Sequence, residues 1–123
     1  MKMTNNEIYT TANQLVAAFN DDTQRLPIKI NFYLQKNKKT LVALAQDIEA
    51  ARMEIAKAYG TLSEAQDQYI IPPENMEKAQ KELNDLFDLE QEVPIGKISI
   101  DKIDEDLVLS AGQMDALMFM IDG

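Results

Sequence analysis

The longest regular pattern of apolar residues lies between Pro27 and Gly60. Apolar residues recur there with a seven-residue period, and no glycine or proline interrupts them. A heptad of this kind keeps one apolar stripe on a single face of an α-helix. The stripe consists of Leu34, Leu41, Ile48 and Ile55, with Ile30, Leu44, Ala51 and Ala58 beside them. We therefore predict a helix over residues 27–59, roughly 50 Å long at 1.5 Å per residue.

The first part of this segment has a second interpretation. Over residues 26–34 apolar and polar residues alternate, which is the period of a β-strand. A strand would need a turn over residues 35–39, where there is no glycine or proline, whereas Pro27 suits the first turn of a helix. We favour the continuous helix. Asn37 falls on its apolar stripe, and we interpret it as a polar residue that sets register or lies at an exposed end, rather than as a functional group.

Two shorter amphipathic segments flank the long helix. The first predicts a helix over residues 4–20, because Thr4 and Glu7 form a capping box ahead of one apolar face. The second predicts a helix over residues 73–89, which starts at a Pro-Pro pair and should pack antiparallel to the long helix. The apolar faces consist of Ile8, Ala12, Leu15 and Phe19 in the first helix and Met76, Ala79, Leu83, Leu86 and Phe87 in the second.

The pattern changes after Glu92. Strand-forming residues over 93–100, interrupted by a possible bulge at Gly96, and again over 107–109 predict a β-hairpin spanning residues 93–109. Ser110 and Gln113 then form a second capping box, which predicts a last helix over residues 110–121. The predicted fold class is α+β, mainly α, in one domain over residues 1–123: a long central helix, antiparallel helical partners, and a C-terminal hairpin plus helix.

The amino-acid composition excludes several common kinds of catalytic and metal-binding site. The chain contains no cysteine and no histidine, so it lacks thiol nucleophiles, disulfides, the usual general base near neutral pH and the commonest transition-metal ligand. We expect a non-enzymatic protein without a cofactor. No signal peptide or apolar run of membrane-spanning length is visible, which favours a cytoplasmic protein that does not enter a membrane.

The net charge of −9 is unevenly distributed. Residues 28–60 carry +3, residues 1–27 carry −1, and residues 61–123 carry −11. An acidic half of this kind repels nucleic-acid phosphates and suits a basic partner surface, although solubility alone also explains it. Direct binding of nucleic acid is therefore not expected.

Carboxylates are densest after the predicted hairpin strand, at Asp101, Asp104, Glu105 and Asp106. A calcium loop needs oxygens at alternating positions and a glycine for its sharp turn, and this segment has neither, so we expect no metal site. The candidate acidic partner-binding residues are Glu90, Glu92, Asp101, Asp104, Glu105 and Asp106.

Two further groups are candidates for binding. Lys29, Lys36, Lys38 and Lys39 form a small basic patch, which either binds phosphate with Tyr33 stacking nearby, or is a solvated face or a match to the acidic half of the chain.

In the last predicted helix, apolar residues lie on more than one side. Met118, Phe119 and Met120 either pack into the core or form an adaptable partner or dimer surface.

Three segments resemble a known class of proteins: LPIKINFYLQKNKKTL, KELNDLFDLEQEVPIGKISI and LSAGQMDALMFMID. Together they resemble small accessory proteins of bacteriophages and prophages of Firmicutes-type bacteria. Those proteins have a lysine-rich helical segment, an E-L-N-x-L motif, an extended V-x-I stretch and an acidic helix with an A-L-x-F-M-I-like tail. The resemblance covers residues 26–121 and implies a phage protein in the host cytoplasm. It supplies no catalytic residue.

Together these features predict a phage-encoded binding protein that inhibits a host antiviral defence factor, a nuclease or a sensor, in the manner of an anti-CRISPR protein. In this hypothesis the acidic residues imitate nucleic acid. The alternative is a structural or assembly role, as a tail-associated or scaffolding protein that binds other phage proteins. A compact chain of this length is roughly 35 Å across, which is shorter than the predicted long helix. Because the other helices cannot cover its whole apolar stripe, a homodimer is also expected.

Overall fold

The protein is described by a computed structural model that covers residues 1–21, 24–63, 65, 68–99, 101 and 107–122. Its described part contains four α-helices: α1 (Asn5–Ala18), α2 (Ile28–Tyr59), α3 (Pro73–Asp88) and α4 (Ala111–Leu117). A 3₁₀ turn, η2 (Met118–Met120), follows α4. The predicted fold class, α+β and mainly α with a long central helix, is confirmed.

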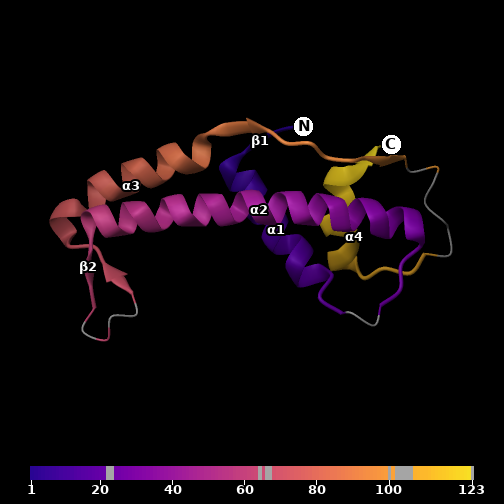
Figure 1. Cartoon of the computed structure of the whole chain (residues 1–123), viewed down its shortest axis with the longest axis horizontal. Helices are drawn as coiled ribbons and strands as arrows, with labels where there is room; N and C mark the ends of the chain where they lie inside the picture. Colours follow the sequence, from indigo (N-terminus) through magenta and orange to yellow (C-terminus); the bar gives the residue numbers. More distant parts are fainter. Residues whose placement is uncertain (22–23, 64, 66–67, 100, 102–106, 123) are drawn as a thin grey trace.

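The long helix α2 is the frame of the molecule (Figure 1). α3 runs antiparallel along its second half, while α1 and α4 cross its first half and middle. α2 starts directly after Pro27, whose carbonyl accepts a hydrogen bond of 2.9 Å from the Asn31 N–H. The helical interpretation of this segment is therefore correct. The strand interpretation is wrong, because α2 continues without a break through residues 35–39, where a strand would have needed a turn.

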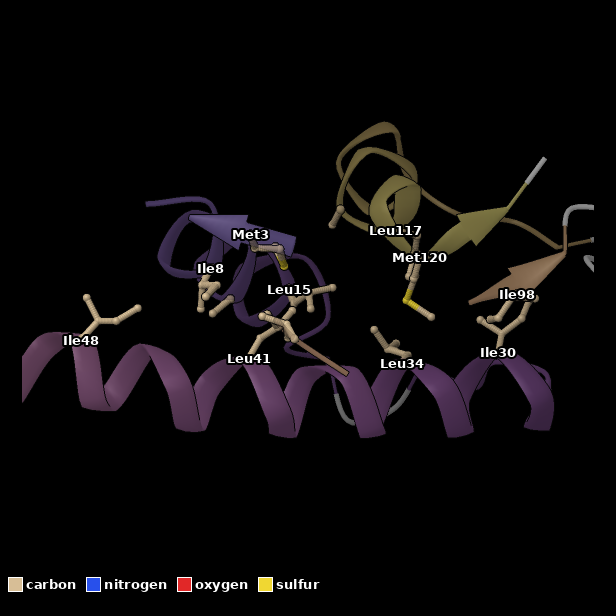
Figure 2. Close-up of a cluster of buried hydrophobic side chains, with 13 residues drawn as sticks. Met3, Ile8, Leu15, Ile30, Leu34, Leu41, Ile48, Ile98, Leu117 and Met120 are labelled. Atoms are coloured by element: carbon tan, nitrogen blue, oxygen red, sulfur yellow. The ribbon is translucent and has the colours of Figure 1, made fainter. Parts of the chain in front are cut away.

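The predicted apolar stripe of α2 is buried over most of its length. Ile30, Leu34, Leu41 and Ile48 are buried, whereas Ile55 is only half-buried. Figure 2 shows two groups of side chains above the stripe: Met3, Ile8 and Leu15 over its middle, and Ile98, Leu117 and Met120 over its start. The second half of α2 has mainly α3 beside it, which accounts for its weaker burial.

α1 lies in the corner between α2 and α3. The Tyr9 ring packs edge-on against Phe87, with ring centroids 5.9 Å apart, and the Tyr9 hydroxyl donates to the Glu49 carboxylate at 3.2 Å. The buried Asn5 amide donates to the Leu86 carbonyl at 2.8 Å and accepts from the Gln91 side chain at 2.7 Å. These polar bridges fix the start of α1 to the end of α3.

The predicted capping box at the start of α1 is confirmed. The Glu7 N–H donates to the Thr4 hydroxyl and the Thr4 N–H donates to the Glu7 carboxylate, both at 3.1 Å. Thr4 also ends a strand that sequence patterns did not reveal, β1 (Lys2–Thr4), which pairs antiparallel with β4 (Glu90–Glu92).

Replacing Thr4 with alanine is expected to lower the free energy of unfolding by about 1 kcal/mol, because one helix N–H loses its cap. Urea denaturation followed by circular dichroism measures this loss. Thr10→Ala, an exposed position within the same helix, is the matched control and should leave stability unchanged or slightly higher. Equal losses in the two variants would contradict a capping role for Thr4.

A small hairpin joins α2 to α3. It consists of β2 (Thr61–Leu62) and β3 (Tyr69–Ile70), which pair antiparallel. Gly60 leads into it through a close approach, since a Cβ atom at this position would lie 2.7 Å from the Ala56 carbonyl oxygen.

The C-terminal part combines a two-stranded sheet with a helix, but its strand pairing differs from the predicted 93–109 hairpin. β5 (Ile98–Ser99) pairs in parallel with β6 (Ile121–Asp122), after the chain has passed through α4 and η2. Residues 107–109 form no strand: Leu107 and Leu109 pack against the core with Val108 directed to solvent. The last predicted helix ends early, because the chain tightens into η2 and then extends beside β5.

Asn37 attaches this C-terminal part to α2. Its side chain is fully buried; its Nδ2 donates to the Gly96 carbonyl at 2.8 Å, and its Oδ1 accepts from the Gly96 N–H at 2.9 Å. A Cβ atom at Gly96 would lie 2.6 Å from the Tyr33 ring, so only glycine allows this approach. Asn37 thus does set register, between α2 and the segment that leads into β5.

Candidate protein-binding surface

The described residues offer no metal-binding group. Among them, no three or more acidic side chains gather closely enough to hold an ion. Asp101 is exposed, while Asp104, Glu105 and Asp106 lie outside the described residues. No helix in the described part of the chain is both long enough and apolar enough to cross a membrane.

The predicted acidic residues of β4 are engaged by the N-terminal segment. The Lys2 ammonium lies 3.0 Å from the Glu90 carboxylate, and this hydrogen bond, with the charge of Glu90, raises the pKa of Lys2. Glu92 is exposed and lies 3.5 Å from the Met1 amino group. Glu90 and Glu92 therefore lie beside the β1–β4 pairing in exposed ion pairs with the N-terminal segment.

The three predicted residues at the end of α4 have different environments. Met118 is 61% exposed, Phe119 is half-buried against the core, and Met120 is fully buried. The assignment of Met120 to a binding surface is wrong. η2 is the reason: with three residues per turn, it directs Met120 toward α2, where its sulfur lies 3.6 Å from the Asn37 amide nitrogen, and leaves Met118 outside.

Two other apolar residues join Met118 on the surface of the C-terminal part. Met114 lies one helical turn before it and is 43% exposed, and Val108 is 86% exposed. Met114 lines a small apolar cavity together with Leu107 and Leu109, which places the segment around Val108 beside α4. We call Val108, Met114 and Met118 the C-terminal apolar face.

The charged residues in the segment that carries this face are all negative. Residues 107–122 carry Asp115 and Asp122 and no lysine or arginine. Both are exposed. Asp122 lies opposite Ser99 in the β5–β6 register, and Ser99 is followed two residues later by the exposed Asp101. No ion pair within the described residues involves these three carboxylates. Sequence patterns missed Val108 and Met114; the signal for Val108 was its place between two leucines that both turn inward.

The predicted basic patch lies on a different part of the molecule. Lys29, Lys36 and Lys39 are exposed along the first half of α2, and Lys38 is half-buried. Two large apolar residues, Ile28 and Phe32, are exposed on the same helix at 79% and 61%. Tyr33 is half-buried, and its ring packs edge-on against Phe32, so it is not free to stack on a ligand.

Among the described residues other than Lys2, shifted pKa values belong to Glu49, Arg52 and Tyr59 in the second half of α2. Arg52 donates hydrogen bonds to Glu49, one of them 2.9 Å long, and thereby lowers the pKa of that carboxyl. The stability from this pair is present at neutral pH and is lost as the pH falls through the lowered pKa; it is small because both groups are partly exposed. Burial, together with a hydrogen bond to Glu82, raises the pKa of Tyr59.

Comparisons with protein-family models, with characterised proteins and with solved structures found no match.

Proposed function

We propose that this chain is a non-enzymatic protein that binds a basic surface of another protein through its C-terminal apolar face. The observation that carries the proposal is the exposure of Val108, Met114 and Met118 in a segment that carries only negative charge. Contiguous exposed apolar side chains with a polar rim are typical of interaction sites. Methionine suits this use because its unbranched side chain adapts to irregular partner surfaces.

The residue inventory supports binding rather than catalysis. The chain has no histidine or cysteine, and the shifted carboxyl of Glu49 is held by Arg52 in a structural pair away from the C-terminal apolar face. General acid–base or nucleophilic catalysis would thus have to use carboxylates, tyrosines or lysines alone.

The target that we propose is a host antiviral defence factor, a nuclease or a sensor. Support comes from the resemblance to phage accessory proteins and from the net charge of −11 on residues 61–123, which suits a nucleic-acid-binding surface. In this form the protein inhibits by stoichiometric occupation of its target in the host cytoplasm.

The test replaces the C-terminal apolar face with serine at Val108, Met114 and Met118. Affinity capture from infected host cells identifies the partner, and calorimetry then measures its dissociation constant for each variant. We expect the triple variant to bind about 100-fold more weakly, since three truncated interface anchors at about 1 kcal/mol each amount to about 3 kcal/mol. Binding should also weaken as salt is added.

The matched control carries serine at three exposed apolar positions elsewhere, Val16, Leu62 and Leu89. This control should bind like the wild type. Equal affinity of both triple variants and the wild type, at low and high salt, would reject the proposed surface. Loss of target activity at one equivalent of protein would identify inhibition as its consequence.

An assembly role is the second candidate. It is favoured by the second half of α2, where Ile55 is only half-buried and where α3 provides most of the cover. Recovery of the protein in purified virions would support this role over inhibition.

A further inference from the structure

The two halves of α2 carry opposite charges on one edge of the helix. Residues 28–46 contain four lysines and no acid, whereas Asp47 and Glu54 follow in the second half. At 3.6 residues per turn, Lys29, Lys36, Asp47 and Glu54 fall within about 20° of one another around the helix axis. All four are exposed. The long helix thus has one continuous edge that is basic at its start and acidic further along.

The charges on this edge are largely unused within the chain. No ion pair among the described residues involves Lys29, Lys36 or Asp47. The Glu54 carboxylate lies 3.8 Å from the Lys57 ammonium, one helical turn away. An exposed ion pair of this kind contributes little to the stability of the fold.

Beside this edge, the apolar side chains of α2 also differ between the two halves. Phe32 is 61% exposed in the first half, and Ala50 is exposed at a nearly equal angle around the helix in the second half. A shallow hollow whose lining includes Val42 and Ala43 lies between them. Figure 1 shows that α1 and α4 pass behind α2, on the side away from the viewer. The large ring of Phe32 near the start of this face is thus matched by the small side chain of Ala50 in the second half of α2.

We propose that two copies of this chain form an antiparallel dimer through this face of α2. The pairs Lys29–Glu54 and Lys36–Asp47 are both centred between residues 41 and 42. A two-fold axis at that point places each lysine opposite the acid of the second copy, and it brings Phe32 to within one residue of Ala50 of the second copy. Because a two-fold axis relates the same edge of both helices, every contact is made twice and the assembly closes as a dimer.

Other arrangements of the same helices do not match charge with charge. A parallel pair sets lysines against lysines and acids against acids, which repel. With its axis between residues 41 and 42, the antiparallel pair overlaps residues 28–55 of both copies, about 42 Å at 1.5 Å per residue. This dimer does not depend on the proposed function, because the C-terminal apolar face lies on other elements.

Sedimentation equilibrium of the purified full chain, from low to high micromolar concentration, tests the dimer. The wild type is expected to be a dimer that weakens as salt is added. Lys29→Glu with Lys36→Glu should weaken it about 100-fold, and so should Asp47→Lys with Glu54→Lys, because each double change replaces four attractions by repulsions. Lys78→Glu with Lys81→Glu, exposed on α3, changes the net charge equally and should leave the dimer intact.

The decisive measurement mixes the two charge-reversed variants in equal amounts. Each is monomeric alone, but their charges complement each other at every contact, so the mixture should form a heterodimer of wild-type strength. Circular dichroism first shows that each variant is folded. The proposal is overturned by a monomeric wild type, by reversed variants that still dimerise, or by a mixture that stays monomeric. None of these outcomes alters capture of a partner by the C-terminal apolar face.

Discussion

Replacing Asn37 with leucine is expected to lower the free energy of unfolding by about 3 kcal/mol, because both hydrogen bonds to Gly96 are lost together. Leucine fills nearly the same volume, so the loss comes from the N–H and carbonyl of Gly96, which are left without partners. Urea denaturation measures the loss. The control is Gln35→Leu, an exposed position on the same helix, which should stay within about 0.5 kcal/mol of the wild type.

An Asn37→Asp variant separates the polar contact from simple packing. The carboxylate would face the Gly96 carbonyl in a fully buried position, so burial and repulsion should raise the pKa of the introduced carboxyl. A pKa raised in the folded state means that the folded protein binds the extra proton. The destabilisation should therefore shrink as the pH is lowered, relative to the wild type at each pH. A pH-independent difference, or a stable leucine variant, would contradict this account of Asn37.

Replacing Leu41 with alanine is expected to cost about 3 kcal/mol. Leu41 is fully buried, and Figure 2 shows it below Leu15 of α1, where its removal leaves a cavity that the rigid helix pair fills poorly. Ile55→Ala, on the same apolar stripe but half-buried, should cost about 1 kcal/mol. Equal losses, measured by thermal or urea unfolding, would mean that the two halves of α2 are held equally well.

Local patterns were sufficient to predict the helices. The heptad of α2 and the two capping boxes, Thr4 with Glu7 and Ser110 with Gln113, involve residues within a turn or two of each other, and the structure confirms them. Their energetics are settled by neighbours in the sequence, which is why periodicity and capping rules find them.

The short strands could not be predicted in the same way. β1 has three residues and β6 has two, and each pairs with a segment far away in the chain. A segment of this length has no periodicity of its own, so its partner decides whether it is a strand. The predicted hairpin is wrong for this reason: β5 lies within the predicted strand 93–100, but Ile121 rather than a residue of 107–109 lies beside it.

Only part of the candidate binding surface could be predicted from the sequence. Met118 was predicted and is exposed, whereas Met120 turns inward because η2 replaces the last turn of the helix. Helical periodicity does not reveal a switch from 3.6 to three residues per turn. For Asn37, position on the stripe was visible from the sequence, but its partner Gly96 was not, because the two are 59 residues apart.

The pairing of β1 with β4 also constrains the order in which the chain acquires its structure. Residues 2–4 are synthesised early, but their partners at residues 90–92 emerge almost ninety residues later, roughly 5 to 20 s at ordinary elongation rates. α1 and α2 can form and meet during that interval, whereas Met3 must wait for α3 to bring β4 into place. Because non-local pairing of this kind is slow to find, closure of the β1–β4 sheet is a late step of folding.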